Sequence, residues 1–158
     1  MEDGMASRKL YTVGQTDQGS LLYATQQIDP CQRILTFQGP RLTYARVARL
    51  ANPDYALQIG ANSYIFCMGN GRYVNHSCEP NAGIKNNVDL VAITRIGVDD
   101  EITMDYSTTM DRLSECDFEC TCGTASCRKT VTGFATLPAD LRERYLDLGI
   151  VQKFLRKD

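Results

Sequence analysis

Three cysteines lie within eight residues in the C-terminal third of the chain: Cys120, Cys122 and Cys127. They form a C-x-C-x4-C array, and Gly123 relieves the tight turn that the chain must make between them. Thiolates this close in sequence can meet at one ion, and zinc is bound tetrahedrally by such ligands. The array therefore predicts a structural zinc site.

A tetrahedral zinc site needs a fourth ligand from another part of the chain. Cys78 is the best candidate, because it lies in a polar loop that a fourth thiolate would hold against the C-terminal segment. Cys116 and His76 compete with it for this role.

The seven cysteines also allow simpler interpretations. Free cysteines are often buried as small apolar side chains, and this is our interpretation of Cys31 and Cys67, each alone in an apolar strand. Redox exchange between Cys120 and Cys122 is a further alternative. Three thiols at this density favour a metal over packing alone.

Length and composition limit the classes of protein to which this chain can belong. The chain has 158 residues, 43% of them hydrophobic and 23% charged, which is typical of one globular domain. Its formal charge is -2 with one histidine, so we expect no direct binding of nucleic acid. Without a secretory signal or an apolar run of the roughly 20 residues that span a bilayer, we expect an intracellular protein, in nucleus or cytoplasm, with no membrane contact.

The elements that must position these residues are mainly short strands. β-rich runs alternate with turn residues, as is typical of small sheets, and predict strands at residues 9–13, 21–24, 33–38, 55–59, 64–67, 88–96 and 101–104. Residues 73–83 are polar and carry neither strand nor helix periodicity. A loop in the middle of a domain invites a functional explanation.

Two helices are predicted. The first begins after Thr43 as N-cap and runs to about Leu50. The second has Pro138 in its first turn and ends before Gly149, with an apolar face at spacings of three and four residues formed by Leu141, Tyr145 and Leu148.

Three segments together resemble a known family. Residues 72–81, RYVNHSCEPN, resemble the R-F-x-N-H-S-C-x-P-N motif of SET-domain protein-lysine methyltransferases. Residues 101–106, EITMDY, resemble that family's E-[LI]-x-x-D-Y motif, and the cysteine array resembles its post-SET zinc segment. The motifs occur in the family's order. The resemblance covers roughly residues 9–130.

This resemblance implies a fold and a domain division. The fold is mainly β (α+β), with small sheets around a pseudoknot in which the two motifs thread together, an exception to the rule against threaded chains. We expect a SET domain at residues 8–107, a post-SET zinc segment at 108–133 and a C-terminal helical extension at 134–158.

The resemblance also assigns roles to residues. Asn75 and His76 are implied to bind the cofactor S-adenosylmethionine, Arg72 to lie near its carboxylate end, and Tyr106 to be the catalytic tyrosine. Cys78, the cysteine of the N-H-S-C segment, stays the best candidate for the fourth zinc ligand.

Further positions match less completely. Residues 19–24, GSLLYA, resemble the family's G-x-G-x-x-A motif, so backbone contacts to the cofactor are expected at Ser20 and at Leu21, which replaces the second glycine. Tyr55 is similar to a strand tyrosine that lines the cofactor or lysine pocket. Phe37, in a segment similar to Y-x-G-E, and Met104 are expected to line the substrate channel.

The expected function is transfer of a methyl group from S-adenosylmethionine to the side-chain amine of lysine in a protein, histone or non-histone. The alternative is a SET-like binding module without catalysis, which the departures at Leu21, Phe37 and Pro40 favour. The partner is a lysine-containing protein or peptide, and a homodimer stays open. Glu101 and Asp105 are either solvated charges or, for Glu101 with neighbouring acidic residues, part of an acidic rim that attracts basic peptides.

Overall fold

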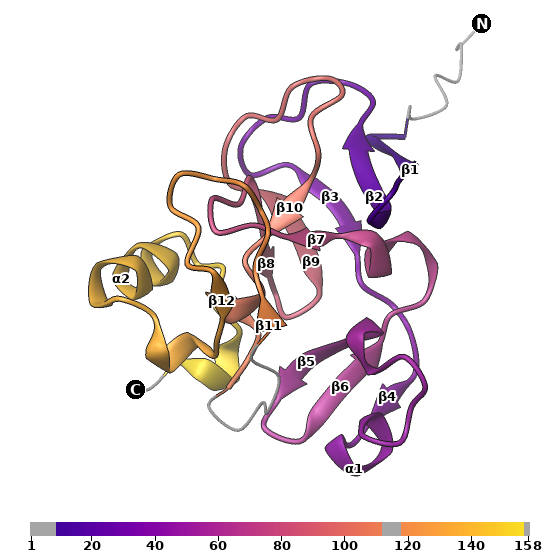
Figure 1. The fold of residues 1–158 in the computed structure, drawn as a ribbon, viewed down its shortest axis with the longest axis vertical. Coiled ribbons are helices and arrows are strands. Elements are labelled where there is room, and N and C mark those ends of the chain that lie inside the picture. Colours follow the sequence, from indigo (N-terminus) through magenta and orange to yellow (C-terminus); the bar gives the residue numbers. More distant parts are fainter. Residues whose placement is uncertain (1–8, 112–117, 157–158) are drawn as a thin grey trace, which may run out of the picture.

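A computed structural model describes residues 9–111 and 118–156 (Figure 1). Within these ranges short strands dominate and the α-helices are brief, which confirms the mainly β fold expected from the sequence. The strands are β1 (Tyr11–Thr16), β2 (Gly19–Ala24), β3 (Arg33–Thr36), β4 (Arg41–Leu42), β5 (Ala56–Gly60), β6 (Ser63–Phe66), β7 (Asn75–His76), β8 (Ala82–Lys85), β9 (Asp89–Ala92), β10 (Thr103–Met104), β11 (Phe118–Glu119) and β12 (Thr130–Val131). The α-helices are α1 (Tyr44–Val47) and α2 (Ala139–Asp147).

Single 3-10 turns fill several of the connections: η1 (Pro53–Tyr55), η2 (Gly69–Tyr73), η3 (Tyr106–Thr108), η4 (Phe134–Thr136) and η5 (Lys153–Leu155). The strands pair in small separate sheets. β1 and β2 form a hairpin, β3–β9–β8 and β4–β6–β5 form three-stranded antiparallel sheets, and β11 pairs with β12. The β4–β6–β5 sheet and α1 project as a lobe at the bottom of the view (Figure 1).

The two segments that resemble the family motifs meet in a parallel pair, β7 with β10. Asn75 lies opposite Thr103 and His76 opposite Met104. The amide N–H of Ser77 continues the pairing with a 3.0 Å hydrogen bond to the carbonyl of Met104. Parallel strands require a long crossover, and here the crossover contains β8 and β9. The motif segments are therefore side by side at the centre of the molecule.

The side chain of Asn81 holds this crossing together. Its amide nitrogen donates to the carbonyl of Glu101 at 2.7 Å, and its amide oxygen accepts from the N–H of Thr103 at 2.9 Å. A side chain that satisfies one backbone donor and one acceptor acts like a strand partner where no strand continues. Asn81 thus does more than cap its own turn.

The main core lies between the hairpin, the β3–β9–β8 sheet and the crossing. Alternate residues of the strands point into it, as the period of two requires: Leu22 and Ala24 are 0% and 1% exposed. Full burial of such a leucine is worth roughly 1.5–3 kcal/mol. A second cluster under α2 contains Phe134, Tyr145 and Ile150.

Several local expectations were wrong. Residues 73–83 are not wholly irregular, because β7 and the start of β8 lie there. The strand pairing of β7 is with a partner 28 positions away, which no local periodicity reveals. The first helix ends at Val47 instead of Leu50, and Thr43 stands at its N-cap without a side-chain hydrogen bond.

Two further differences concern Cys31 and strand length. Cys31 is exposed and has a φ of 71°, so it lies in a turn and not in the apolar strand expected for it. Cys67 is buried, as predicted. The strand expected at 88–96 is limited to β9, after which residues 93–96 continue as an irregular segment.

The predicted C-terminal helix is confirmed as α2. Pro138 is its N-cap residue, one position before the helix, and Gly149 follows its end with a φ of 68°. A positive φ at this point is the usual way for a glycine to end a helix. In the part of the chain that the structure describes, neither α-helix has the length and apolar character that a membrane crossing requires.

Candidate active site

Tyr106 lies two positions after the end of β10 and contacts the β7 segment through both its backbone and its hydroxyl. Its backbone N–H donates to Nδ1 of His76 at 3.1 Å, and its hydroxyl donates to the carbonyl oxygen of Val74 at 2.7 Å. The residue is thereby held at both its backbone and its ring tip. The two motif segments are joined through this one side chain as well as through their strands.

These contacts define the protonation state of His76. Nδ1 accepts from Tyr106, so the proton of the neutral ring is on Nε2, which faces Sγ of Cys78 at 3.4 Å. Burial lowers the pKa of His76 to about 4, against an opposing effect of Asp105. The ring is therefore neutral near pH 7, and its 3.5 Å approach to Asp105 is not an ion pair. His76 links the cysteine cluster to Tyr106.

The electrostatic surroundings keep Tyr106 protonated. Burial raises the pKa of its phenol well above the ordinary value, and the negative charges of Asp54 and Glu101 act in the same direction. A phenol of this kind is a hydrogen-bond donor and not a base. Its chemical use is to orient a partner atom.

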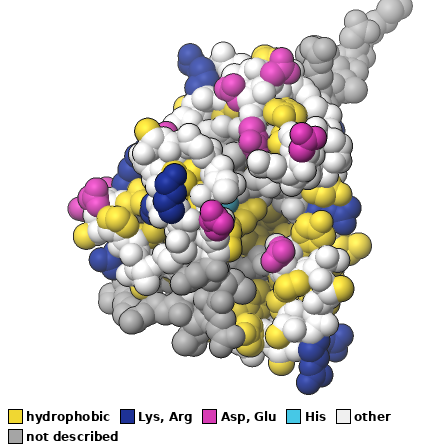
Figure 2. All heavy atoms as spheres, in the orientation of Figure 1, with side chains coloured by type: hydrophobic (Ala, Val, Ile, Leu, Met, Phe, Trp, Pro, Cys, Tyr) yellow, Lys and Arg dark blue, Asp and Glu magenta, His cyan; other side chains and the backbone are white. Residues whose placement is uncertain are grey.

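An aromatic cluster surrounds this donor. The ring centroids of Tyr106 and His76 are 5.4 Å apart, and Phe118 stands 5.9 Å from Tyr106 and 6.3 Å from His76. Phe118 is 38% exposed and was not singled out in the sequence. On this face, hydrophobic side chains gather in a hollow beside the single histidine, with acidic side chains near its margin (Figure 2).

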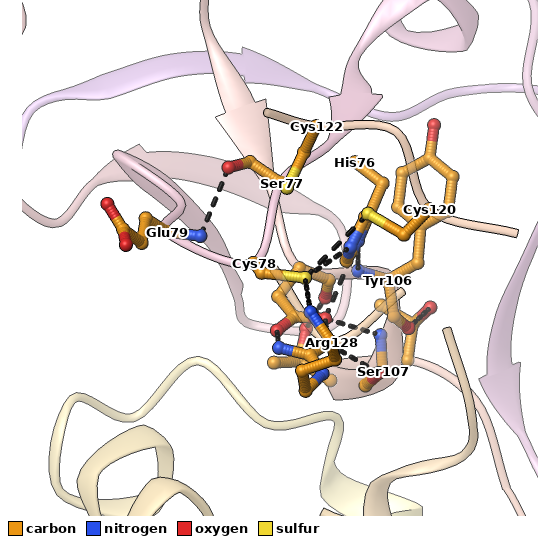
Figure 3. Close-up of polar contacts among 12 residues, drawn as sticks. His76, Ser77, Cys78, Glu79, Tyr106, Ser107, Cys120, Cys122 and Arg128 are labelled. Carbon is orange, nitrogen blue, oxygen red and sulfur yellow. Dashed lines mark hydrogen bonds and ion pairs between the residues drawn. The ribbon is translucent and has the colours of Figure 1, made fainter. Parts of the chain in front are cut away.

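Four thiols converge beside the same histidine, and Figure 3 shows three of them, Cys78, Cys120 and Cys122. The sulfur atoms of Cys78, Cys120, Cys122 and Cys127 all lie within 4.8 Å of one another. Strands β11 and β12 bring the three-cysteine loop back on itself, with the N–H of Cys120 bonded to the carbonyl of Lys129 at 2.8 Å. Cys116, a competing candidate, lies outside the described residues.

The electrostatics of this cluster fit a metal dication. Burial raises the pKa of Cys120 to about 12. Burial also opposes ionisation of Cys122, but hydrogen bonds from Thr124 and the Cys78 backbone outweigh it and lower its pKa to about 6. Ionisation of Cys122 is thus favoured and ionisation of Cys120 is disfavoured, as expected for sulfur atoms so close together. A bound dication would favour deprotonation of the other thiols as well, because thiols that coordinate zinc are deprotonated.

Asp105 was expected as a solvated charge, and this was wrong. Asp105 is only 1% exposed, and its carboxylate forms an ion pair with Arg128 at 2.9 Å. Burying a charge in this way is tolerated only when it is paired and hydrogen-bonded. Arg128 was not singled out in the sequence, and Tyr145, the other partner of Asp105, was expected only on the apolar face of the C-terminal helix.

The residues expected to bind cofactor divide into two groups. Arg72 packs its guanidinium over the rings of Tyr55 and Tyr73, at 5.6 and 4.8 Å from the centroids. Asn75 belongs with His76 at the crossing, and its Nδ2 donates to Glu101 Oε1 at 3.0 Å. Glu101 is therefore bonded within the site.

Strand β2 joins these groups. It lies against η2, which carries Arg72, and the carbonyl of Leu22 accepts from Ile102 at 2.8 Å. Ser20 and Leu21 are thus in the strand beside the site, although the Leu21 side chain is buried and the Ser20 hydroxyl accepts from Gln15 at 2.8 Å.

The two residues expected in a substrate channel are both buried. Phe37 and Met104 are each 5% exposed and belong to the main core cluster. Met104 is opposite His76 in the crossing, and Phe37 lies close to Gly71, where an added Cβ would approach its ring at 2.9 Å. Met104 is thus part of the crossing, and Phe37 lies beside η2 in the same core cluster.

Comparison with known proteins agrees with this geometry. The SET domain family model matches residues 19–107. A histone-lysine N-methyltransferase, H3 lysine-4 specific, of Aspergillus fumigatus is 27% identical over 126 residues, covering 68% of this chain and 10% of the relative. Histone-lysine N-methyltransferase SETD1A of Homo sapiens is 28% identical over 126 residues, covering 68% of this chain and 7% of the relative. The chain thus spans about a tenth of the length of these relatives or less.

A solved structure shows the same fold. The crystal structure of KRYPTONITE in complex with mCHG DNA and SAH matches with a TM-score of 0.62 at 23% identity, over 78% of this chain and 29% of that one. The family model covers more than half of the chain and includes both segments of the β7–β10 crossing. The chain belongs to the SET domain family.

Proposed function

We propose that this chain transfers a methyl group from S-adenosylmethionine to the side-chain amine of lysine in a protein. The observation that carries the proposal is the position of the Tyr106 hydroxyl, 2.7 Å from the Val74 carbonyl in the β7–β10 crossing and walled by His76 and Phe118. The relatives named above are histone-lysine methyltransferases, and the KRYPTONITE crystal contained SAH, the demethylated form of this cofactor.

The proposed chemistry needs binding and alignment more than acid–base groups. S-adenosylmethionine, when bound, supplies a methyl carbon that its sulfonium makes electrophilic. Asn75, His76 and Arg72 bind the cofactor in this scheme, with backbone contacts from Ser20 and Leu21. Tyr55 lines the same pocket.

Lysine must be deprotonated before it can attack, since its ordinary pKa is about 10.4. An apolar channel disfavours the ammonium form, and the aromatic rings around Tyr106 with Phe37 and Met104 provide such a wall in our proposal. The Val74 carbonyl is an acceptor for an N–H of the amine, and the Tyr106 hydroxyl orients the reacting groups. Alignment of this kind lowers the barrier by avoiding the entropy of bringing reactants together.

We propose further that Cys78, Cys120, Cys122 and Cys127 hold one structural zinc ion. A closed four-thiolate site has no open position for substrate, so the ion is assigned no chemical step. Its role is to fix the segment that carries Phe118 against the loop that carries His76. Binding free energy of the metal would then contribute to the order of the site.

The domain division and the cell compartment stay predictions. We propose the SET domain at residues 8–107, the zinc segment at 108–133 and the C-terminal extension at 134–158. The location that we propose is nucleus or cytoplasm. Whether that protein is a histone is decided by experiment.

The second candidate is a SET-like module that binds without catalysis. The buried Leu21 side chain in place of a motif glycine favours it. Calorimetric titration of zinc-loaded protein with S-adenosylmethionine and SAH, followed by a methyl-transfer assay on lysine peptide arrays with mass readout, separates the two. Cofactor binding with a mass gain of one or more methyl groups supports the enzyme. Binding of neither compound rejects it.

A further inference from the structure

The carboxylate of Asp105 is surrounded by donors from three parts of the chain. Oδ1 accepts from the N–H of Ser107 at 3.0 Å and from Nη2 of Arg128 at 2.9 Å. Oδ2 accepts from the hydroxyl of Tyr145 at 2.8 Å and lies 2.9 Å from Nη1 of Arg128. The guanidinium of Arg128 therefore meets both carboxylate oxygens, through a hydrogen bond from Nη2 to Oδ1 and an ion-pair contact of Nη1 with Oδ2 that lacks hydrogen-bond geometry.

Two of these donors come from segments that lie far beyond Asp105 in sequence. Arg128 follows the zinc-ligand candidate Cys127, and its own backbone N–H points at Sγ of Cys78 at 3.4 Å (Figure 3). Tyr145 is in α2 and is only 2% exposed. The cysteine loop and the C-terminal helix thus converge on one carboxylate.

That carboxylate belongs to the residue immediately before Tyr106. Its bond to Ser107 and the bond from the Thr108 hydroxyl to the Asp105 carbonyl, 2.8 Å, set the turn η3 in which Tyr106 is the first residue. The direction of the Tyr106 ring depends on the backbone of this turn. A donor that fixes Asp105 therefore also fixes Tyr106, without touching it.

Stability alone does not account for such an arrangement. Buried ion pairs are frequently no more stabilising than apolar residues of the same volume, because desolvation cancels the attraction between the charges. What a fully paired buried carboxylate does provide is one defined geometry. The geometry here is that of the turn which presents Tyr106.

We infer that Arg128 and Tyr145 are positioning residues that hold Tyr106 in its working orientation through the Asp105 carboxylate. The inference rests on the proposed methyl transfer. It makes the C-terminal helix part of the active unit, because Tyr145 contributes a bond that no residue of the SET match itself supplies.

The test uses the full zinc-loaded chain with Tyr145→Phe, which keeps the ring and removes one donor. Ile150→Val is the matched control, since Ile150 is buried in the same cluster and does not bond to Asp105. We expect Tyr145→Phe to lower kcat about tenfold, as for loss of a hydrogen bond to a charged group, with zinc content and cofactor Kd unchanged. Ile150→Val should keep the wild-type kcat even if it lowers Tm as much as Tyr145→Phe does, or more. Equal kcat in the two variants at matched Tm would overturn the inference.

A second measurement does not require activity. His76 is the only histidine, so its ring gives a single set of imidazole NMR signals, and the Tyr106 amide reports the bond between the two residues. Tyr145→Phe should shift both sets of signals more than Ile150→Val does. If the wild-type chain transfers no methyl group, the proposed function fails. The NMR shifts of the two variants still show whether Tyr145 positions Tyr106. Equal shifts in both variants would reject it.

Discussion

The hydroxyl of Tyr106 donates a 2.7 Å hydrogen bond to the carbonyl oxygen of Val74, across the parallel pair that joins β7 to β10. This contact puts a protonated phenol and a backbone acceptor at one point, next to the only histidine. A lysine amine needs both a wall that disfavours its charge and an acceptor that orients it. The Val74 carbonyl supplies the acceptor, and the Tyr106 ring supplies one side of the apolar wall.

Replacing Tyr106 by Phe should separate binding from chemistry. The ring remains, so cofactor affinity should be kept, while loss of the hydroxyl should lower kcat by about 10²-fold or more, as for removal of one preorganised donor. Single-turnover methyl transfer and calorimetry with S-adenosylmethionine measure the two effects. Tyr44→Phe, at an exposed ring on α1, is the control and should leave both unchanged. Normal turnover in Tyr106→Phe would remove this tyrosine from its assigned role.

Replacing Cys122 by Ser should release the metal. Structural zinc sites depend on all four ligands, so zinc measured by mass spectrometry should fall from about one ion per chain, and cofactor binding should weaken as the Phe118 segment loosens. Cys31→Ser changes an exposed thiol outside the cluster and should keep the zinc. Full zinc occupancy and unchanged cofactor affinity in Cys122→Ser would contradict the proposed ligand set.

Glu101 should orient the side-chain amide of Asn75. The 3.0 Å bond from Nδ2 to Glu101 leaves the amide oxygen of Asn75 as the acceptor for a ligand. Glu101→Gln keeps the size but loses the charge, and we expect cofactor Kd to rise about five- to tenfold, corresponding to roughly 1 kcal/mol. Asp17→Asn, at the exposed β1–β2 turn, is the charge-matched control. Equal affinities of the two variants would show that Glu101 does not orient this amide.

Gly39 should be intolerant of any side chain. Its φ is +156°, and an added Cβ would overlap the carbonyl oxygen of Phe66, which cannot move freely because it belongs to β6. Gly39→Ala should lower the free energy of unfolding by more than about 3 kcal/mol, measured by denaturant titration. Gly19→Ala has a similar φ of +120° but open space, so its loss should be smaller. Equal losses would mean that strain in φ alone, and not the overlap, limits this position.

Short-range patterns in the sequence were enough to predict most of the strands and helices and three members of the thiol cluster. The strands β1, β2, β5 and β6 follow from alternating and β-branched residues, and the end of α2 follows from Gly149. The cysteine array indicated a metal cluster by spacing alone, and the convergence of Cys78 with it agrees with the best of the three candidates for the fourth ligand. The strands, the end of α2 and the three-cysteine array depend on residues close together in the chain, where composition and periodicity carry the information. The contact of Cys78 with the array joins residues 42 positions apart.

The tertiary structure alone decided which distant groups meet. Nothing near Asp105 in sequence indicated that its carboxylate would be buried, because its partners Arg128 and Tyr145 are 23 and 40 residues away. The same is true of Phe118 beside Tyr106 and of the proton position in His76, which its two hydrogen-bond partners fix. A local pattern reports which face of a strand or helix is apolar. Whether a charge is solvated or paired depends on what packs against it, and that is settled only when segments remote in sequence come together.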